Sequence, residues 1–319
     1  MDEKHALTDE KIRQIQADIA RFEYKPKISI IMPIYNVDRI WLEKAIESVI
    51  NQLYPNWELC MVDDASPKAH IRKTLEKYAQ KDKRIKIKYF VRNQGMSVSY
   101  NEALMLATGE FAGTLDHDDE LTPDALYENV KLLNRNPLLD MIYSDEDKID
   151  IRQRRSDPFF KPDYSPDMLL CMSYICHFTI FRREKLLAVG GFRAGYDGAQ
   201  DYDIMLRFTE KTYPDKIAHI PKILYHWRKI PGSAALTTDA KNYAYISAKK
   251  ALCDYLDRNK IAGGVSEGHF IGAYRIRRGI VQPDKVSIIV PFRDRVDLLK
   301  QCVSSILRKQ IIRTMKFCW

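Results

Sequence analysis

Short apolar segments alternate with helical segments between residues 28 and 147, and this alternation constrains the fold more than any other feature. Each expected strand is an apolar run that ends in polar residues: 28–36, 57–66, 85–91, 111–116 and 139–147. The intervening segments have helical periodicity: 38–51, 68–81, 95–107 and 122–134. Runs that are apolar throughout are typical of strands buried on both faces of a parallel sheet. The chain is therefore predicted to be an α/β protein with a Rossmann-like, mostly parallel central sheet and helices on both faces.

The segments outside this alternation are less regular. Residues 7–24 predict an amphipathic helix that Thr8 could cap, and Pro26 breaks it. Residues 154–170 contain three prolines and predict a long ordered loop. Further on, 217–229 alternates like a strand and 239–259 is periodic like a helix.

An internal repeat divides the chain. The segment KISIIMPIYN at 27–36 returns as KVSIIVPFRD at 285–294, and the helical segments that follow match in their apolar positions. The repeat predicts that a second domain of the same type begins at 285 and is truncated after one strand and one helix. The expected organisation is an N-terminal helix (1–24), a first domain (25–240), a helical, basic connector (241–284) and the partial second domain (285–319).

The net charge of +8 is confined to the last quarter of the chain. Residues 241–319 carry 16 Lys and Arg against 6 Asp and Glu, so the preceding 240 residues have a local charge of −2. A nucleic-acid surface interleaves aromatic with basic residues, whereas the densest basic cluster, 275–278, has only Tyr274 beside it. Nucleic acid is thus not an expected partner. The basic quarter either faces a partner domain or makes peripheral contact with an anionic inner-membrane surface.

Membrane insertion and secretion are not expected. No window approaches the roughly 18–20 apolar residues of a membrane-spanning helix, and the N-terminus is charged. The six cysteines include no CxxC pair and are expected to be reduced. These features predict a cytoplasmic protein, free or peripheral at the cytoplasmic face of the inner membrane.

Acidic residues follow three of the expected strands. They are Asp63 and Asp64, then Asp116, Asp118 and Asp119, then Asp145, Glu146 and Asp147. Ligands of open α/β sheets bind at the carboxyl ends of the strands. Clustered carboxylates repel one another unless a cation or donor groups offset them, and Mg²⁺ takes one or two carboxylates plus substrate oxygens. The pattern predicts a site for a metal ion and a diphosphate, with Asp119 or Thr122 as the alternative cap of the next helix.

Four segments together resemble the family 2 glycosyltransferases, which have the GT-A fold. They are SIIMPIYN (29–36), VDDAS (62–66), RNQGMSVSYNEAL (92–104) and TLDHDDELTP (114–123). Three later segments are similar to the bacterial branch that builds O-antigen, rhamnan and other cell-surface polysaccharides, often with two catalytic domains in tandem: YSDEDKID (143–150), FKPDYSPDMLL (160–170) and LYHWRKIPGSAA (224–235). The resemblance covers 27–240 and the segment from 285.

This resemblance implies a hexosyl- or deoxyhexosyltransferase. The expected donor is a nucleoside-diphosphate-sugar, and the expected acceptor is a hydroxyl of a saccharide or lipid-linked glycan. Matching positions imply that Pro33 and Tyr35 line the nucleobase pocket, that Asp64 binds the base, and that Asn93, Gly95 and Asn101 approach the nucleotide. Asp116 would contact the ribose or the metal, and Asp118 would ligate Mg²⁺ or Mn²⁺. His226 either approaches the metal or diphosphate or is a packed strand histidine beside Trp227.

The catalytic base of the family comes from a Glu-Asp pair at the start of a helix. This chain has Gln200-Asp201 at that position. The resemblance implies that Asp201 is the base, with Asp203 as the second candidate. A single base without a covalent nucleophile implies inversion at the anomeric carbon. Asp145, Glu146, Gln200 and Trp227 are candidate contacts to the acceptor or donor sugar.

Two other functions remain open. A nucleotidyltransferase or metal-dependent phosphohydrolase also uses carboxylates at strand ends. A nucleotidyltransferase, however, usually has a glycine-rich basic loop after the first strand, where this chain has PIYNVDR. A catalytically impaired sugar-nucleotide-binding module is the second alternative, because Gln200 replaces an acid. Turnover of a nucleotide-sugar separates these functions.

Overall fold

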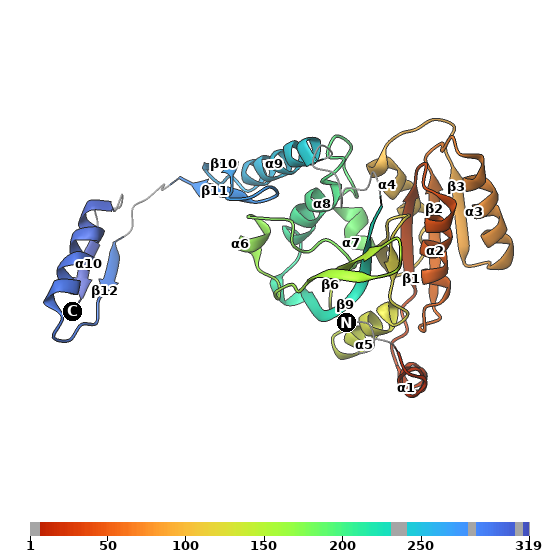
Figure 1. Cartoon of the computed structure of the whole chain (residues 1–319), viewed down its shortest axis with the longest axis horizontal. Helices are drawn as coiled ribbons and strands as arrows, with labels where there is room; N and C mark the ends of the chain where they lie inside the picture. The colour runs from red at the N-terminus through yellow and green to blue at the C-terminus, as the bar shows by residue number, and fades with distance from the viewer. Residues whose placement is uncertain (1–6, 231–240, 280–284, 310–314, 319) are drawn as a thin grey trace. The chain divides into compact units, whose positions relative to one another are not determined.

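The computed structural model describes residues 7–230, 241–279, 285–309 and 315–318. The chain forms two compact units. One comprises residues 1–255 and 265–276, and the other comprises 256–264 and 277–319. Every residue of the candidate site described below belongs to the first unit, and most elements of this unit are labelled in Figure 1.

The first unit is built on one mixed sheet with the order β3-β2-β1-β4-β8-β6-β9-β5, with β7 paired to β6. Six strands share one direction: β1 (Ile28–Ile34), β2 (Trp57–Asp63), β3 (Ile85–Tyr89), β4 (Phe111–Thr114), β6 (Met141–Asp150) and β9 (Ile217–Lys229). Three run the other way: β5 (Glu120–Leu121), β7 (Arg155–Phe159) and β8 (Thr179–Arg182). The mostly parallel sheet is confirmed. The insertion of antiparallel β8 between β4 and β6 was not predicted, since it pairs residues far apart in sequence.

Helices cover both faces of this sheet, as predicted. One face packs against α2 (Arg39–Ile50), α3 (Ala69–Lys81) and α5 (Ala125–Arg135), and α1 (Asp9–Arg21) packs against α5. The other packs against α4 (Met96–Leu106), α7 (Arg183–Ala188), α8 (Gln200–Thr209) and α9 (Lys241–Arg258). Thr8 caps α1 by accepting a hydrogen bond from the Lys11 amide at 3.2 Å. Helix α5 begins at Ala125 rather than 122, and Thr122 donates a hydrogen bond to Asp124 instead of capping it.

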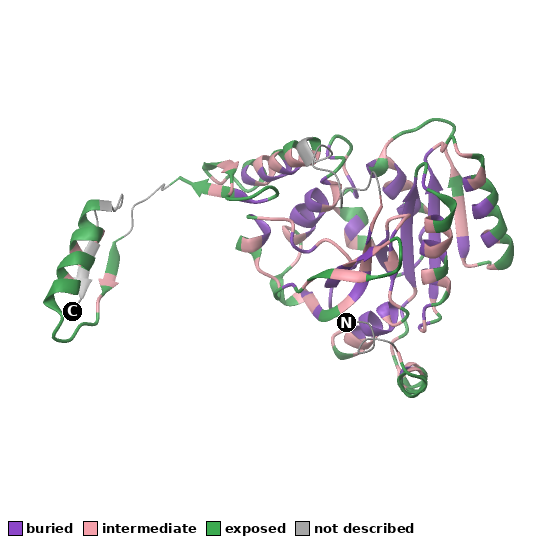
Figure 2. Cartoon of the chain, in the orientation of Figure 1, coloured by how far each residue is buried: buried purple, intermediate pink, exposed green. Residues whose placement is uncertain are grey.

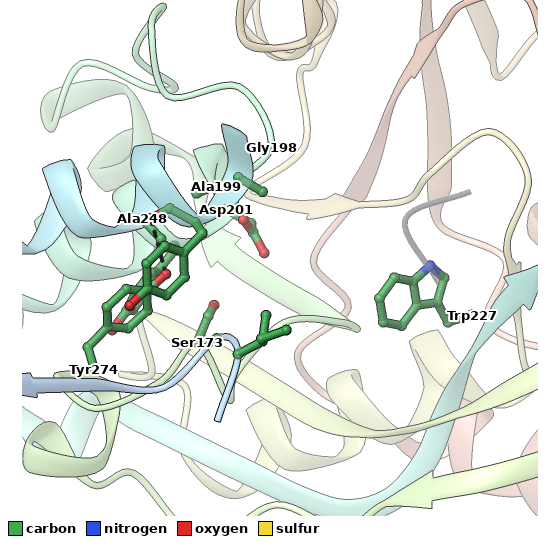
Figure 3. A pocket seen from close by; sticks show the side chains of 12 residues that line it. Ser173, Gly198, Ala199, Asp201, Trp227, Ala248 and Tyr274 are labelled. Carbon is green, nitrogen blue, oxygen red and sulfur yellow. Dashed lines mark hydrogen bonds between the residues drawn. The ribbon is translucent and has the colours of Figure 1, made fainter. Parts of the chain in front are cut away.

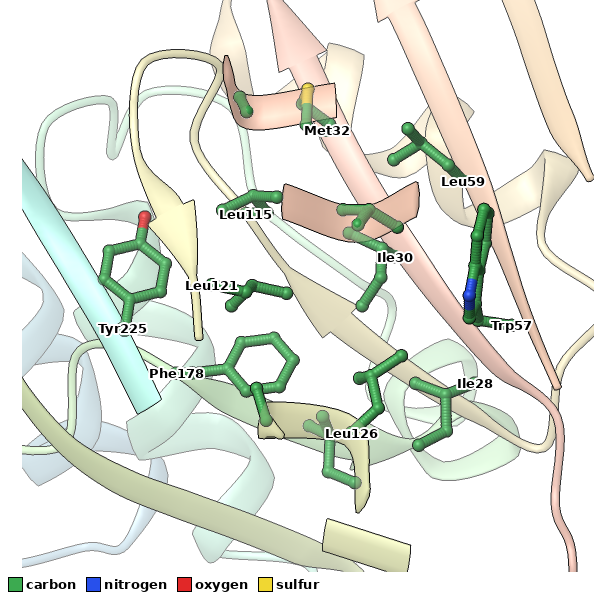
Figure 4. Packing of buried hydrophobic residues seen from close by; sticks show 14 of the residues in the cluster. Ile28, Ile30, Met32, Trp57, Leu59, Leu115, Leu121, Leu126, Phe178 and Tyr225 are labelled. Atoms are coloured by element: carbon green, nitrogen blue, oxygen red, sulfur yellow. The ribbon is translucent and has the colours of Figure 1, made fainter. Parts of the chain in front are cut away.

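The middle of the sheet is buried on both sides, which explains why β1 is apolar throughout. All seven residues of β1 are buried. Ile28, Ile30 and Met32 point into one core with Trp57, as Figure 4 shows, whereas Ile31 packs in the core on the opposite face. The strands at the centre of the unit are accordingly the most continuously buried segments in Figure 2. This rigid layer fixes the loops at its carboxyl edge.

Gly113 in β4 offers a test of this packing. A Cβ at this position would lie 2.9 Å from the Phe178 ring and 3.0 Å from Ile180. We expect Gly113→Ala to lower the free energy of unfolding by about 1–3 kcal/mol, because a tightly packed core must move to accept a methyl group. Urea denaturation measures this change. Gly264→Ala is the control, since a Cβ there meets open space, and an equal loss in both variants would contradict the packing argument.

The remaining segments are short. The region 154–170, predicted as a loop, contains β7 and the four-residue helix α6 (Pro166–Leu169). A 3₁₀ turn, Pro214–Lys216, precedes β9. Strands β10 (Gly263–Glu267) and β11 (Tyr274–Arg278) form a two-stranded sheet. Within the described ranges, no helix is long and apolar enough to cross a membrane. Contact with a membrane surface stays a prediction.

The sequence repeat is also a structural repeat. Strand β12 (Val286–Ile289), α10 (Val296–Lys309) and β13 (Met315–Cys318) form a parallel β-α-β unit. The second copy thus contains a second strand after its helix, which corrects the prediction of one strand and one helix. Val286 aligns with Met315, the same register in which Ile28 aligns with Trp57 in the first copy. After the first strand of each copy, one residue has a positive φ, 51° at Asn36 and 55° at Asp294. The second copy thus repeats the turn as well as the strands. The domain boundaries stay a prediction.

Candidate active site

The candidate site lies where the strand order reverses, between β1 and β4. In an open α/β sheet this is where a crevice forms at the carboxyl ends of the strands. A cleft of about 540 Å³, here called the larger cleft, opens at this place. It is lined by Pro33, Ile34, Tyr35, Asp64, Asn93, Gly95, Met96, Ser99, Asp116, His117, Asp118, Asp197, Trp227 and Tyr243. The structure therefore brings together the predicted nucleotide residues, except Asn101, with the predicted metal ligands Asp116 and Asp118.

Asp64 shapes one wall of the larger cleft. Its Oδ1 accepts a hydrogen bond from the Gln94 amide at 2.7 Å, and its Oδ2 accepts one from the Gly95 amide at 2.9 Å. Gly95 has a φ of 90°, a conformation that favours glycine, and this lets its amide turn toward the carboxylate. Asp64 is nearly fully buried at the end of β2. The carboxylate thus fixes the loop that carries Asn93 and Gly95.

Asp116 and Asp118 follow β4 and face the larger cleft together. Asp116 Oδ1 accepts a hydrogen bond from the Tyr100 hydroxyl at 2.7 Å, and its Oδ2 lies 4.0 Å from His177 Nε2. Asp118 Oδ1 lies 3.2 Å from His117 Nδ1. Burial favours the neutral Asp118 carboxyl, but neighbouring His117 outweighs burial and lowers the pKa of Asp118. Asp118 is therefore held in the charged form that a cation requires.

These two carboxylates fit a divalent ion that completes its coordination with phosphate oxygens and water. Mg²⁺ is usually bound in this way, through one or two carboxylates plus substrate phosphates. Among the residues that the structure describes, no three His, Cys, Asp or Glu side chains form a group that could hold a metal by themselves. The donor set thus suits a metal that arrives with a diphosphate, rather than an ion caged by protein alone.

A second cleft of about 270 Å³, here called the smaller cleft, contains the predicted base. It is lined by Ser173, Gly198, Ala199, Asp201, Tyr202, Trp227, Ala244, Tyr245, Ala248, Ile271, Gly272 and Tyr274. In Figure 3 the Asp201 carboxylate and the Trp227 indole face each other across this space. Trp227 also lines the larger cleft, so the two clefts adjoin at this side chain.

Asp201 sits in the first turn of α8, where the helix dipole favours a negative charge. Burial raises the pKa of the Asp201 carboxyl above its ordinary value, although the nearby His177 acts in the opposite direction. A carboxyl with a raised pKa is a stronger base once it is ionised. The environment is therefore suited to proton transfer.

The family model for glycosyl transferase family 2 matches residues 29–190, which is half of the chain. The chain belongs to glycosyltransferase family 2. It is 37% identical over 297 residues to the O-antigen biosynthesis protein RfbC of Myxococcus xanthus, a match that covers 93% of this chain and 23% of that protein. Two curated relatives match this chain along most of its residues. The chain spans about a third or less of the length of each.

Two solved structures show the same fold. TarS residues 1–349 from S. aureus, in complex with UDP-GlcNAc, has a TM-score of 0.55 at 19% identity, covering 73% of this chain and 72% of that one. The mannosyltransferase PcManGT from Pyrobaculum calidifontis, in complex with GDP-Man and Mn²⁺, has a TM-score of 0.50 at 18% identity, covering 78% and 71%. The expected GT-A fold is thus confirmed.

His226 is not part of the site, which corrects the metal ligand set expected from the family 2 resemblance. Successive side chains of a strand point to opposite faces, so His226 and Trp227 of β9 face different ways. His226 Nδ1 lies 2.5 Å from Asp147 Oδ1, and the imidazole lines a separate groove with Lys44, Glu47 and Glu120. His226 is a strand histidine paired with an acid, and Trp227 is the neighbour that reaches both clefts.

The alternative base, Asp203, is engaged in the core. Its side chain is fully buried and accepts hydrogen bonds from Arg193 Nε at 3.1 Å and Arg207 Nε at 2.9 Å. These two guanidinium groups bind the carboxylate away from both clefts. Gln200 holds the turn before α8, since its Oε1 accepts a hydrogen bond from the Gly198 amide at 2.8 Å. Asp201 is therefore the acid of this helix that remains in the site.

Asp145 and Glu146, predicted as sugar contacts, are buried and do not line either cleft. Asp145 Oδ1 accepts hydrogen bonds from the Lys161 amide at 2.9 Å and from His219 Nε2 at 2.8 Å. Glu146 Oε2 accepts hydrogen bonds from Lys161 Nζ at 3.0 Å and from the His177 amide at 3.0 Å. Glu146 thus holds the segment that carries His177, and Asp145 joins Lys161 to His219.

Asn101 and Asp119 also have structural contacts. Asn101 Nδ2 donates to the Phe192 carbonyl at 2.7 Å and its Oδ1 accepts from the Phe192 amide at 2.8 Å, which ties α4 to the turn after α7. Asp119 accepts hydrogen bonds from the Tyr225 hydroxyl at 2.5 Å and the Arg228 amide at 2.7 Å. It therefore fastens the acidic loop to β9, instead of capping the next helix.

Sequence reasoning missed three residues of the site. Asp197 Oδ1 accepts a hydrogen bond from Ser97 Oγ at 3.0 Å, and this closes the far wall of the larger cleft. His177 stacks on Tyr225 with ring centroids 4.6 Å apart, close to Asp116. Tyr243 reaches the larger cleft from α9. Asp197 and Tyr243 line the larger cleft, whereas His177 lies beside its Asp116. The contacts that place these residues join segments distant in sequence, so no local pattern signals them.

Proposed function

We propose that this chain is an inverting, metal-dependent glycosyltransferase. It would transfer a sugar from a nucleoside-diphosphate-sugar to a hydroxyl of a saccharide or lipid-linked glycan during cell-surface polysaccharide synthesis. One observation carries the proposal: Trp227 is shared by the larger cleft, with Asp116 and Asp118, and the smaller cleft, with Asp201. A donor in the first and an acceptor in the second would meet beside this indole.

The larger cleft would bind the donor. Pro33, Tyr35 and the loop fixed by Asp64 would contact the nucleoside at one end. Asp116 and Asp118 would hold Mg²⁺ or Mn²⁺ at the other end, where the metal would offset charge on the nucleoside diphosphate as it leaves. Two structures of the same fold, TarS in complex with UDP-GlcNAc and PcManGT in complex with GDP-Man and Mn²⁺, support this class of ligand.

Asp201 would act as the general base. The acceptor hydroxyl would donate its proton to the Asp201 carboxylate as its oxygen forms a bond to the anomeric carbon. The bond between that carbon and the diphosphate oxygen would break on the opposite side, and the electron pair would leave with the nucleoside diphosphate. A single displacement of this kind inverts the anomeric configuration.

A donor screen tests the proposal. The full chain is incubated with Mn²⁺ and a panel of UDP-, dTDP- and GDP-sugars, and nucleotide release is measured beside calorimetric binding of each donor. Release from at least one donor is the expected result. Binding without release would favour a non-catalytic sugar-nucleotide module. The absence of both binding and release with every donor would reject the proposal.

The pH dependence of transfer tests the assignment of the base. Because Asp201 must be ionised to accept a proton, we expect kcat/KM to fall as the pH drops through its raised pKa. Gln200→Glu places a second negative charge beside it, which raises the pKa of Asp201 further and moves the acidic limb of the profile to higher pH. Profiles of both proteins at saturating Mn²⁺ measure the shift. A limb that stays in place or moves to lower pH would contradict the assignment.

A further inference from the structure

Helix α9, predicted as part of a connector, is packed against the turn that precedes the candidate base. Gly198 has a φ of 83°, and a Cβ at this position would overlap the Tyr243 ring of α9. Ser247 Oγ donates a hydrogen bond to the Asp197 carbonyl at 3.2 Å. The first turns of α9 therefore form part of the site. Tyr243 lines the larger cleft, and Tyr245 and Ala248 line the smaller one.

Aromatic rings make up much of the smaller cleft's wall. Tyr245 and Tyr274 are stacked, with centroids 5.0 Å apart and planes 18° from parallel, and the Tyr202 centroid lies 6.2 Å from that of Tyr274. The Tyr274 hydroxyl donates to the Tyr245 carbonyl at 3.3 Å, and the Tyr202 hydroxyl donates to the Leu169 carbonyl. Tyr202 and Tyr274 are almost fully buried, whereas Tyr245 is only half-buried, so Tyr245, backed by Tyr274, is the ring that offers its surface to a ligand.

Small residues keep the smaller cleft open beside these rings. Gly198, Ala199, Ala244, Ala248 and Gly272 all line the cleft. Tyr274 is held in place because its amide donates a hydrogen bond to the Cys171 carbonyl at 2.7 Å. Apart from the tyrosine hydroxyls and the Trp227 indole, the polar side chains among the described lining residues are Ser173 and Asp201. The cleft is thus an apolar cavity with polar groups at one side, as small-molecule sites usually are.

A pyranose ring matches this distribution. One of its faces presents mainly C–H groups, which gain free energy when they are removed from water against an aromatic surface, while its hydroxyls need hydrogen-bond partners. We propose that the smaller cleft binds the terminal pyranose of the acceptor, with its C–H face against the Tyr245 ring, which is stacked on Tyr274, and its attacking hydroxyl at Asp201. This inference rests on the proposed function, since it names the acceptor side of that same site.

The consequence is that acceptor selection belongs to residues 243–248 and 271–274. These segments lie outside the first domain predicted from the sequence and outside the residues matched by the family model. They replace Asp145 and Glu146 as the sugar-contacting residues.

Filling the cleft tests the inference. The probes are methyl α- and β-pyranosides, and the measurement is nucleotide release from a donor with and without each probe. In the unmodified chain, at least one pyranoside should bind, by saturation-transfer NMR, and stimulate release above hydrolysis by water. Ala248→Phe should reduce this stimulation at least tenfold, because the ring would fill the smaller cleft, and should leave nucleoside-diphosphate affinity unchanged, because Ala248 does not line the larger cleft. Ile246→Phe is the matched control, because Ile246 is on the same helix and 62% exposed.

A second pair of variants tests whether the Tyr245 ring binds the sugar or only supports the fold. Tyr245 is half-buried, so its truncation should leave the chain folded. Tyr245→Ala should lose the stimulation, and Tyr245→Phe should keep it, since the inference assigns binding to the ring. Equal stimulation in Ala248→Phe, Tyr245→Ala and the unmodified chain would overturn the inference.

The outcomes also distinguish this inference from the function on which it rests. If UDP or another nucleoside diphosphate binds but no pyranoside does, the smaller cleft is not a sugar site and the inference is rejected, while the donor assignment stands. If no nucleotide or nucleotide-sugar binds at all, the proposed function itself fails.

Discussion

Asp201→Asn is expected to lower the rate of sugar transfer by about 10²–10⁴-fold, the usual contribution of a positioned general base. The amide has nearly the same shape as the carboxylate but cannot accept a proton from the acceptor hydroxyl. Asp201 lines the smaller cleft, whereas the residues assigned to the nucleotide line the larger one. Donor affinity should therefore remain close to that of the unmodified chain. Initial rates of transfer, together with calorimetry of donor binding, measure both effects.

The matched control for this variant is Asp215→Asn. Asp215 lies in the short 3₁₀ turn before β9, and its side chain is 75% exposed, so the same chemical change there should leave transfer unaffected. Transfer by Asp201→Asn at the rate of this control would show that another group takes the proton. Asp203 is not a plausible substitute, because Arg193 and Arg207 bind its carboxylate in the core.

The second large effect is expected for Asp118→Ala, which should remove the metal-dependent part of nucleoside-diphosphate binding. Loss of a metal's outer-shell partner typically costs about 10- to 100-fold in affinity, and loss of a direct ligand should cost at least as much. Burial opposes ionisation of Asp118, but the neighbouring His117 lowers the pKa of this carboxyl, which favours the ionised form that binds a cation. Calorimetric titration of UDP or GDP, with and without Mn²⁺, measures the difference.

The metal-free titration is the internal control for this prediction. Without Mn²⁺, the variant and the unmodified chain should bind the nucleotide alike, since nucleoside contacts come from the Asp64 loop and the β1 end. Asp215→Ala should retain the metal effect in full. An unchanged Mn²⁺ effect in Asp118→Ala would mean that the metal is held elsewhere or is not used.

The acids at the strand ends show what can be predicted from local sequence and what cannot. Each of the three groups follows an apolar strand and has the same appearance in the sequence. The structure gives them different tasks: Asp116 and Asp118 face the larger cleft, Asp64 fixes a loop, and Asp145 is buried against Lys161 and His219. A carboxylate's task depends on which donors face it, and those donors come from elsewhere in the chain.

Strand β9 and helix α9 likewise have roles that depend on contacts from elsewhere in the chain. The sequence places His226 and Trp227 side by side, but only the pairing of β9 with β6 and β5 decides which of them faces the clefts. The periodicity of 239–259 correctly predicted a helix, yet not that it forms a wall of the site, because its contacts with Asp197 and Gly198 are tertiary.

The sequence by itself determined the α/β class, the mostly parallel sheet, the repeat and the acids that follow the strand ends. These follow from short-range periodicity and from the rule that strand ends gather at one edge. Only the tertiary structure decided which acids enter the clefts, that Trp227 joins them, and that α9 and β11 enclose the smaller one. The physical reason is that the decisive contacts, such as Ser97 with Asp197 and Tyr225 with Asp119, join residues about a hundred positions apart.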